Sequence, residues 1–403
     1  MFSLRNVLPN TRCLIRAYSL QVETTSLYNF HLKNKGKIVN FGGFLLPVQY
    51  NDQSIVNSHV FTRKNASIFD VSHMLQTEIR GKHCIEFIES LCTADIQSLK
   101  NGNGTLTIFT NETGGILDDL IVTKIDEETL YIVSNAAMKQ QDQQIMMHGL
   151  NNYKKHHNPN AKIEINFLEP RERALVALQG PKAAQALQKL TETDLSSLYF
   201  MNSIESVVGN VKNCRITRCG YTGEDGFELS IPAAKAENIV EMLLENVNVK
   251  LAGLGARDSL RLEAGLCLYG SDINSTTTPV EAALTWLVAK RRRTEVNFPG
   301  APEILKQIKQ GSQIKRIGLT LDSGPPARHG AQILSEDGES LGEVTSGCPS
   351  PSLNNKNIAM GYVKTDFSKI GTKVNLKIRE KLYKGAVVKM PFVQTNYYVK
   401  QKV

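Results

Sequence analysis

Long apolar runs and paired cysteines are missing from this 403-residue sequence. No stretch of 18 consecutive uncharged apolar residues occurs, so the sequence predicts no membrane-spanning helix. The seven cysteines include no Cys-x-x-Cys pair, and no histidine or cysteine pair has the spacing of metal ligands. We therefore predict neither a disulfide framework nor a metal site. The Gly-x-Ser-x-Gly elbow of serine hydrolases and the Gly-x-Gly-x-x-Gly dinucleotide fingerprint are missing as well.

Acidic residues are missing from the first 18 positions, since the first acid is Glu23. Arg5, Arg12 and Arg16 lie there among scattered apolar residues, a composition typical of a mitochondrial presequence. We expect residues 1–18 to be cleaved near Tyr18 and the mature chain to lie in the mitochondrial matrix. The alternative is a basic, disordered tail on a cytosolic protein.

The full sequence has the composition of an ordinary globular protein, with 41% apolar and 21% charged residues. Its length favours two to four domains. Helical periodicity is expected over 138–155 and 232–247, and strands over 120–123, 130–133 and 174–178. Because helices and strands do not alternate regularly, the pattern predicts an α+β fold.

Beyond about residue 300 the pattern changes to short strands separated by turns, after one short helix over 302–310. Strands are expected over 316–321, 331–334, 341–345, 358–363, 374–378 and 386–389, with a hairpin signal at Asp337-Gly338. This spacing predicts a separate small β-barrel.

The segment Arg218-Cys-Gly-Tyr-Thr-Gly-Glu-Asp-Gly-Phe-Glu228 carries three glycines where a strand needs apolar alternation. Glu228 stands between Phe227 and Leu229, so its side chain should face away from theirs. A carboxylate beside a glycine loop suits bidentate binding of a planar N–H edge such as a guanidinium, pterin or purine. The alternative is a β-bulge with a solvated glutamate.

Asp118 and Asp119 follow Gly114-Gly115 and precede an apolar run. On a strand only one of two adjacent side chains faces a given side, so only one is expected to reach a ligand. The alternative is an acid pair that caps a turn.

Six segments of the sequence together resemble the aminomethyltransferase family, the T-proteins of the glycine cleavage system. The resemblance runs in order from about Leu27 to Tyr398. Its segments are Phe69-Asp-Val-Ser-His-Met74, Gly114 to Leu120, Arg218 to Glu228, Gly253 to Gly270, Met390-Pro-Phe392 and Asn396-Tyr-Tyr398.

The resemblance implies a three-domain cloverleaf with folate in a central hole. The first two domains are expected to be interleaved, over 19–75 with 168–260 and over 76–167 with 261–305. The barrel is expected over 306–403.

The resemblance also implies roles for single residues. Asp119 matches the catalytic acid group, and Arg257 matches a position that contacts the substrate. Tyr221, Asn135 and Tyr397 are similar to folate-pocket positions, although Tyr398 beside Tyr397 leaves that choice open. Glu228 is expected to bind the pterin edge.

By the same resemblance, the chain is expected to take the aminomethyl group from the dihydrolipoyl arm of H-protein and release ammonia. The methylene passes to tetrahydrofolate, a co-substrate, without a metal. The implied partners are H-protein and the P- and L-proteins of glycine cleavage.

Two other functions are considered. A non-catalytic folate-binding factor of iron–sulfur assembly usually bears Lys-Gly-Cys-Tyr-x-Gly-Gln-Glu, whereas residues 264–272 here lack the lysine and the Gln-Glu. A nucleic-acid-binding function would be supported by the formal charge of +8. The aromatic and helix-turn-helix patterns of such proteins are missing, however.

Four consecutive cations occupy Lys290 to Arg293. Neighbours on a helix lie about 100° apart, so one helix face cannot pair them all. We predict that Arg291, Arg292 and Arg293 help to dock H-protein or the folate glutamate tail, with Arg292 as the principal contact. The alternative is a solvated basic patch.

Overall fold

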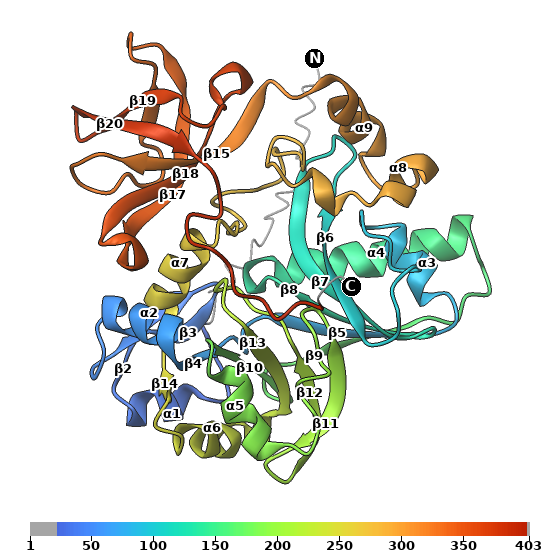
Figure 1. Ribbon diagram of the computed structural model, residues 1–403. Helices are drawn as coiled ribbons and strands as arrows, with labels where there is room; N and C mark the ends of the chain where they lie inside the picture. The colour runs from blue at the N-terminus through green and yellow to red at the C-terminus, as the bar shows by residue number, and fades with distance from the viewer. Residues whose placement is uncertain (1–21, 401–403) are drawn as a thin grey trace, which may run out of the picture.

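The computed structural model describes residues 22–400 and shows three lobes around a common centre (Figure 1). Two lobes combine helices with sheets, and the third, at the upper left, is a barrel of strands. The predicted α+β class and the C-terminal barrel are confirmed.

The first lobe is built on a six-stranded sheet in the order β11-β12-β13-β10-β4-β14. These strands are β4 (Ala66–Asp70), β10 (Arg173–Gln179), β11 (Ser203–Val208), β12 (Val211–Thr217), β13 (Gly226–Pro232) and β14 (Val249–Leu251). Apolar side chains of the sheet, including Phe227 and Leu229, pack against α5 (Ala183–Leu187) and α6 (Ala236–Leu244). The alternation around Glu228 therefore places its two neighbours in the core.

The N-terminal part of the same lobe adds a smaller sheet in the order β1-β3-β2 and two helices. These elements are β1 (Glu23–Thr24), α1 (Tyr28–Lys33), β2 (Gly36–Phe41), β3 (Phe44–Tyr50) and α2 (Ile55–Lys64). The helix expected over 232–247 is shorter than predicted, because a 3-10 turn over Ala233–Lys235 precedes α6 and the helix ends at Leu244.

The second lobe is an antiparallel sheet in the order β6-β7-β8-β5-β9, covered by two helices. Its elements are β5 (Leu75–Arg80), α3 (Cys84–Glu89), β6 (Asn103–Thr110), β7 (Ile116–Asp126), β8 (Thr129–Ser134), α4 (Lys139–His156) and β9 (Glu164–Leu168). Leu120 and Val122 of β7 are buried in the core with residues of α3 and α4. The alternate side chains of β7 face the centre of the molecule.

The chain passes between the first two lobes more than once. It leaves the first sheet after β4, forms the whole second sheet between Leu75 and Leu168, and returns to the first sheet at β10. Later it forms α7 (Leu254–Glu263), α8 (Lys290–Glu295) and α9 (Ala301–Gln310) before the barrel. The sheets are thus interleaved in sequence, while the domain boundaries themselves stay predictions.

The C-terminal barrel closes in the order β15-β18-β17-β16-β19-β20. Its strands are β15 (Ile314–Leu321), β16 (Gln332–Leu334), β17 (Ser340–Ser350), β18 (Lys356–Lys364), β19 (Lys373–Ile378) and β20 (Lys381–Val388). The strand expected over 341–345 continues to Ser350. A register shift between Val344 and Ser346 lets residues 346–350 stay paired with β18.

Helix α7 lies where the lobes meet, and its last residue is the centre of a buried ionic cluster. The Glu263 carboxylate accepts from His59 Nε2 at 3.0 Å and from Arg63 Nη2 at 2.8 Å, both on α2. It also accepts from Ser350 Oγ at 2.5 Å and Ser352 Oγ at 2.7 Å at the end of β17. One carboxylate therefore joins the first lobe to the barrel.

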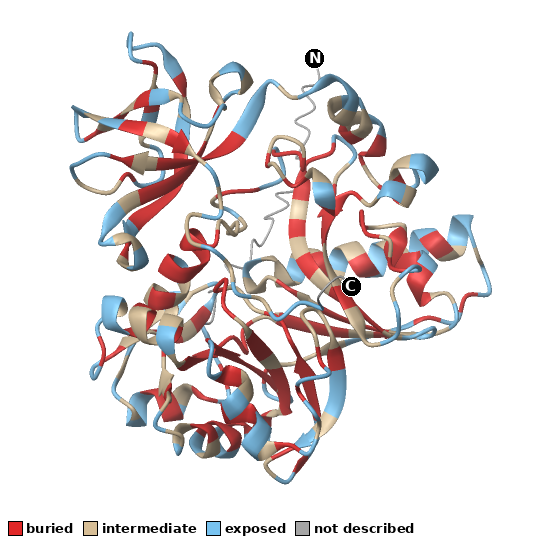
Figure 2. Ribbon diagram, in the orientation of Figure 1, coloured by how far each residue is buried: buried red, intermediate tan, exposed pale blue. Residues whose placement is uncertain are grey.

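Burial is concentrated inside each lobe and where the lobes face one another (Figure 2). Burial opposes ionisation of Glu263, but hydrogen bonds and charge from His59, with the Ser350 and Ser352 hydroxyls, hold its pKa at about 2. Within residues 22–400, no helix is long and apolar enough to cross a membrane.

We expect Glu263→Gln to lower the free energy of unfolding at pH 7 by about 3 kcal/mol, because the buried His59 and the partly buried Arg63 lose their charged acceptor. Since the pKa of Glu263 falls from 4.5 to about 2 on folding, the stabilisation is complete above pH 4.5 and is lost as the pH falls toward 2. The difference in the free energy of unfolding between the wild type and Glu263→Gln should therefore become smaller in acid. Urea unfolding at several pH values measures it.

The matched control is Glu241→Gln, whose carboxylate pairs with Lys33 at 3.2 Å on the exposed surface. We expect a change of less than about 1 kcal/mol there. Equal losses in the two variants would contradict the role given to Glu263.

Candidate active site

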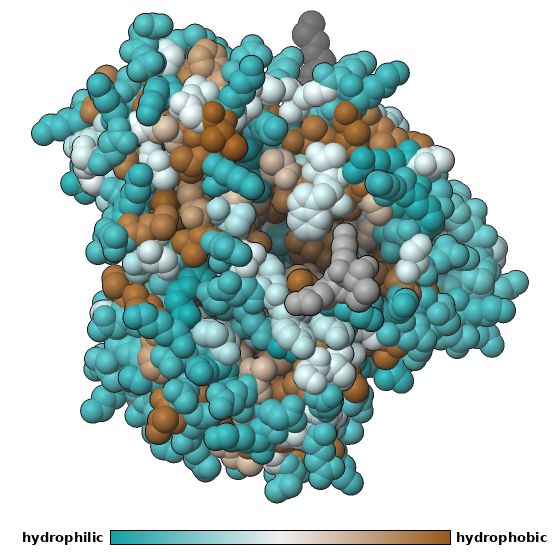
Figure 3. Space-filling model, viewed as in Figure 1, coloured by the Kyte–Doolittle hydropathy of each residue, from teal (hydrophilic) through white to brown (hydrophobic). Residues whose placement is uncertain are grey.

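A cavity of about 750 Å³ lies at the centre, where all three lobes contribute side chains. Apolar side chains gather around a hollow in the middle of the face shown in Figure 3, while hydrophilic side chains cover most of the outer surface. The cavity receives all six residues predicted to bind or transform the substrate: Asp119, Asn135, Tyr221, Glu228, Arg257 and Tyr397. The structure thus brings together residues that lie up to 278 positions apart, from 119 to 397.

Strand β7 sends its two adjacent aspartates to opposite sides. Asp119 lines the cavity, whereas Asp118 is fully buried on the side of α4. Asn135 bridges them, since its Nδ2 donates to Asp118 Oδ1 at 2.9 Å and to Asp119 Oδ1 at 2.9 Å. Only Asp119 can therefore meet a ligand in the cavity.

The carboxyl of Asp119 is held close to half-ionised at neutral pH. Burial raises its pKa and the neighbouring Asp118 raises it further, while the hydrogen bond from Asn135 and the charge of Arg257 oppose the rise, to give a pKa of about 7. A group with such a pKa can both accept and donate a proton near neutrality.

Glu228 and Arg257 form the charged part of the same cavity. Glu228 projects from β13, and Arg257 projects from the first turn of α7. Burial raises the pKa of Glu228, although the charge of Arg257 acts in the opposite direction. The Arg257 guanidinium lies over the Tyr221 ring, 4.5 Å from its centroid.

Glycines let the loop before β13 pass close to its neighbours. A Cβ at Gly220 would come within 1.8 Å of Gln179 Oε1, and Gly223 has φ +79°. The Tyr221 hydroxyl at the tip of this loop donates to the Cys267 carbonyl. The close packing at Gly220 and the positive φ at Gly223 explain why the motif has glycine at these two positions.

The chain after the barrel crosses the centre of the molecule as an extended segment, drawn in dark red in Figure 1. The Asn396 amide donates to the Gly223 carbonyl at 2.7 Å. Tyr397 stacks on Phe200 with centroids 4.2 Å apart and lines the cavity. Tyr398 instead stacks on Tyr199 away from it. The open choice between the two tyrosines is resolved in favour of Tyr397 as the cavity residue.

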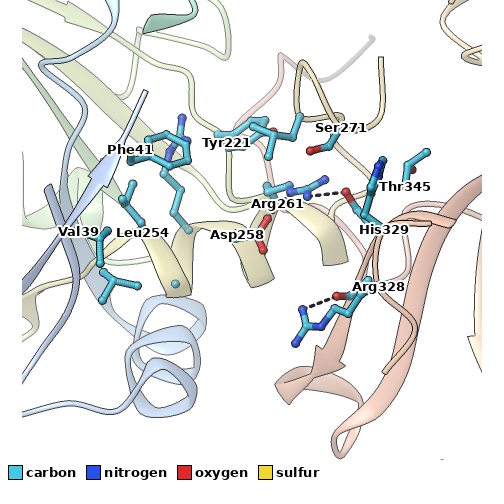
Figure 4. A pocket seen from close by; sticks show the side chains of 16 residues that line it. Val39, Phe41, Tyr221, Leu254, Asp258, Arg261, Ser271, Arg328, His329 and Thr345 are labelled. Carbon is cyan, nitrogen blue, oxygen red and sulfur yellow. Dashed lines mark hydrogen bonds and ion pairs between the residues drawn. The ribbon is translucent and has the colours of Figure 1, made fainter. Parts of the chain in front are cut away.

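A second, smaller cavity of about 470 Å³ shares Tyr221 and Arg257 with the first. Figure 4 shows it between α7 and loops of the barrel, with Phe41 on one side and the exposed Arg328 and His329 on the other. The side chains of Tyr221 and Arg257 therefore form part of the wall of both cavities.

Within the Phe69–Met74 motif, Asp70 and His73 contact different neighbours. Asp70 accepts from His31 at 2.8 Å and from Thr25 at 2.6 Å. His73 packs against Phe41, and burial together with the charge of Arg257 lowers its pKa to about 3. Sequence reasoning missed His31, because nothing local to Asp70 indicates a partner from α1. Among residues 22–400, no cluster of His, Cys, Asp or Glu could hold a metal ion.

The structure corrects the prediction that Arg292 is the principal contact of a docking partner. Arg292 is fully buried, and it donates to Glu295 Oε2 at 2.7 Å and to the Glu89 carbonyl. It cannot therefore be the principal contact of a partner.

The two flanking arginines are also engaged by the protein itself. Arg291 donates to Glu89, Asp95 and Glu295 at 2.5, 2.8 and 2.6 Å. Arg293 donates to two backbone carbonyls, those of Val288 and Thr285. The arginine side chains point in different directions, as expected of a helix. Glu89 of α3 and Asp95 of the loop that follows α3 form ion pairs with Arg291.

Sequence reasoning missed several residues at the cavity mouth. Trp286 is 64% exposed and Ile370 is 69% exposed, and both line the cavity with the exposed Lys315 and Lys389. The one available signal was Trp286, the single tryptophan of the chain.

Comparisons with known proteins find similarity over nearly the whole chain. Residues 27–292 match the family model of the GCVT N-terminal domain, and residues 315–394 match that of the glycine cleavage T-protein C-terminal barrel domain. The mitochondrial aminomethyltransferase of Canis lupus familiaris is 51% identical over 96% of this chain and 94% of its own length. That of Homo sapiens is 51% identical over 93% and 91%. That of Flaveria pringlei is 48% identical over 95% and 92%.

One solved structure is also similar to this chain over most of its length. The glycine cleavage system aminomethyltransferase T of Bartonella henselae is 37% identical and superposes with a TM-score of 0.86. The match covers 94% of this chain and 99% of the other. The likeness extends through all three lobes, including the centre that they enclose.

We expect Arg292→Ala to lower the free energy of unfolding by about 3–5 kcal/mol, because Glu295 and the Glu89 carbonyl lose a buried donor. Lys290→Ala, at an exposed position of the same run, should change it by less than about 0.5 kcal/mol. Urea unfolding measures both. A docking role for Arg292 would instead predict unchanged stability in both variants.

Proposed function

We infer the substrates of this chain from its family: it belongs to the glycine cleavage T-proteins and is an aminomethyltransferase. We propose that it moves the methylene of an aminomethyl group from the dihydrolipoyl arm of H-protein to tetrahydrofolate, with release of ammonia. Since the relatives named above are enzymes, the alternative of a non-catalytic assembly factor is not supported.

The observation that carries the proposal is the meeting of Asp119, Glu228 and Arg257 at one cavity. The volume of about 750 Å³ is within the range of sites for small organic ligands. The Glu228 carboxylate is suited to the N–H and NH₂ edge of a pterin, because a carboxylate accepts two parallel hydrogen bonds. Tyr221 and Tyr397 offer flat faces and hydroxyls for the rest of the ligand.

Asp119 supplies the proton transfers that the reaction needs. Two C–N bonds form between the carbon and two folate nitrogens, while the C–S bond to the arm and the C–N bond to the amine break. The two protons that leave the folate nitrogens balance those taken up by the sulfur and by the departing amine. A carboxyl with a pKa of about 7 can take one from the folate and release it to a leaving group.

The enclosure of the cavity by three lobes serves the same chemistry. Water would capture the transferred carbon as formaldehyde, so both reacting groups have to meet away from bulk solvent. The second cavity, which Arg328 and His329 line, gives a protein-borne arm and a folate separate approaches to the residues that both cavities share, Tyr221, Arg257 and Leu268.

The relatives in dog and human are named mitochondrial, and this chain is assigned to the mitochondrion with them. We propose the matrix as the compartment, where H-, P- and L-proteins would be its partners. The predicted presequence, residues 1–18, lies outside the described residues.

Glu228→Gln is expected to weaken tetrahydrofolate binding by about 1.5–3 kcal/mol, because one charge-assisted bidentate contact becomes neutral. The readout is the fluorescence of Trp286, the single tryptophan of the chain, which lines the cavity. Glu237→Gln, on the exposed side of α6, is the control. A change in folate affinity of less than about twofold would remove Glu228 from the proposed site.

Asp119→Asn is expected to lower turnover roughly 10²–10⁴-fold with little change in folate affinity, because the proton acceptor is lost while the cavity keeps its shape. Turnover is measured as ammonia released from aminomethylated H-protein in the presence of tetrahydrofolate. Normal turnover in a folded Asp119→Asn protein would refute the assignment.

A further inference from the structure

We propose that Tyr398, whose side chain lies outside the central cavity, is a positioning residue for folate binding. Its ring holds Tyr397 and Phe200 in the part of the cavity wall that they form. The proposal rests on the folate site proposed above, and it gives a role in substrate binding to a residue that does not itself line the 750 Å³ cavity.

Two aromatic pairs lie where the segment after the barrel, drawn in dark red in Figure 1, meets the loop before β11. Tyr397 stacks on Phe200 with centroids 4.2 Å apart, and both line the cavity. Tyr398 stacks on Tyr199 with centroids 5.4 Å apart and planes within 5°, and neither lines the cavity. We call these four residues the aromatic clasp, with an inner and an outer pair. Each loop carries one member of each pair on adjacent residues, so the outer pair fixes the backbone that carries the inner pair.

The backbone also joins the two halves of the aromatic clasp. The Phe200 N–H donates to the Tyr398 carbonyl at 2.8 Å. The Asn396 N–H donates to the Gly223 carbonyl at 2.7 Å. Tyr397 therefore lies between two residues whose main chains are bonded to the first lobe.

The outer pair is held by a fixed cation. The Arg218 guanidinium carbon lies 3.9 Å from the centroid of the Tyr398 ring, and a cation over an aromatic face attracts it. Arg218 is buried and donates to both carboxylate oxygens of Asp225, at 2.8 and 2.6 Å. It also donates to the carbonyls of Leu195 and Leu198, both at 2.7 Å. With its donors engaged in this way the guanidinium cannot follow the ring, so it holds Tyr398 in place although that residue is 39% exposed.

The loop that carries Phe200 needs such support. The next residue, Met201, also lines the cavity and has φ +66°, which is uncommon outside glycine. A residue in this conformation persists only where its surroundings hold the backbone. Without the Tyr398 ring the inner pair becomes free to change conformation, and a ligand that binds against it then has to order two side chains at a cost in affinity.

Two substitutions at Tyr398 separate the ring from the hydroxyl. Tyr398→Ala removes both, whereas Tyr398→Phe removes only the hydroxyl, which donates to the Ser196 carbonyl at 3.1 Å. We expect the Kd of tetrahydrofolate, measured by titration calorimetry, to rise about tenfold in Tyr398→Ala. It should stay within about twofold of the wild type in Tyr398→Phe and in the control Tyr28→Ala, a partly exposed tyrosine of α1 outside the cavity.

Turnover distinguishes this role from a general loss of structure. Because Tyr398 holds the ligand's surroundings and not the proton-transfer group, kcat at saturating tetrahydrofolate should stay within about twofold in Tyr398→Ala, while KM for tetrahydrofolate rises with Kd. Circular dichroism checks that the variants are folded.

A double-mutant cycle tests the stack itself. Tyr199→Ala should weaken folate binding as Tyr398→Ala does, and the double variant should be no weaker than either single variant, because both act through one contact.

Hydrogen exchange tests the aromatic clasp without folate. The Phe200 amide, which donates to the Tyr398 carbonyl, should exchange faster in Tyr398→Ala than in the wild type and at the wild-type rate in Tyr398→Phe.

Any of three outcomes overturns the proposal: a Kd in Tyr398→Ala within about twofold of the wild type, an equal loss of affinity in Tyr398→Phe, or additive losses in the double variant. If the wild-type protein binds no tetrahydrofolate, the proposed function fails. Hydrogen exchange decides the aromatic clasp in that case, and an unchanged Phe200 amide in Tyr398→Ala would show that Tyr398 does not hold the inner pair.

Discussion

The buried Glu263 carboxylate is the interaction on which the central cavity depends. It ends α7 and is held by His59 and Arg63 from the first lobe and by two serines of the barrel. The same helix begins at the cavity with Arg257. A shift of α7 relative to the lobes would therefore move a charged wall of the cavity. Because a buried charge with several donors tolerates little displacement, the lobes are fixed relative to each other.

A second consequence of assembling the cavity from three lobes is the desolvation of its acidic side chains. Each lobe excludes water from residues that the others contribute, so Asp119 and Glu228 lose solvation that a single sheet could not remove. Burial is the largest cause of the raised pKa at both positions. The fold and the ionisation of the site are thus linked, since proton-transfer chemistry near neutrality requires the lobes to be docked.

Much of the fold and part of the site could be predicted from the sequence, because their signals are local. Strand alternation determined that Glu228 faces away from Phe227 and Leu229, and that only one of two adjacent aspartates reaches the cavity. The barrel strands were visible from their turn spacing. The choice of Asp119 over Asp118 and the meeting of six residues came from the resemblance to a family, since no local pattern shows which distant segments converge.

The incorrect choice of Arg292 as a docking contact shows where local reasoning ends. Periodicity correctly indicated that one helix face cannot pair four cations. It could not show that Glu89 and Asp95, some 200 positions earlier, approach from α3 and the loop that follows it. The same limit hid His31 behind Asp70. Charge patterns in a sequence report how many ions a segment carries, whereas tertiary structure decides whether an opposite charge is buried beside them. A cationic run is therefore evidence for a binding surface only once its side chains are known to reach solvent.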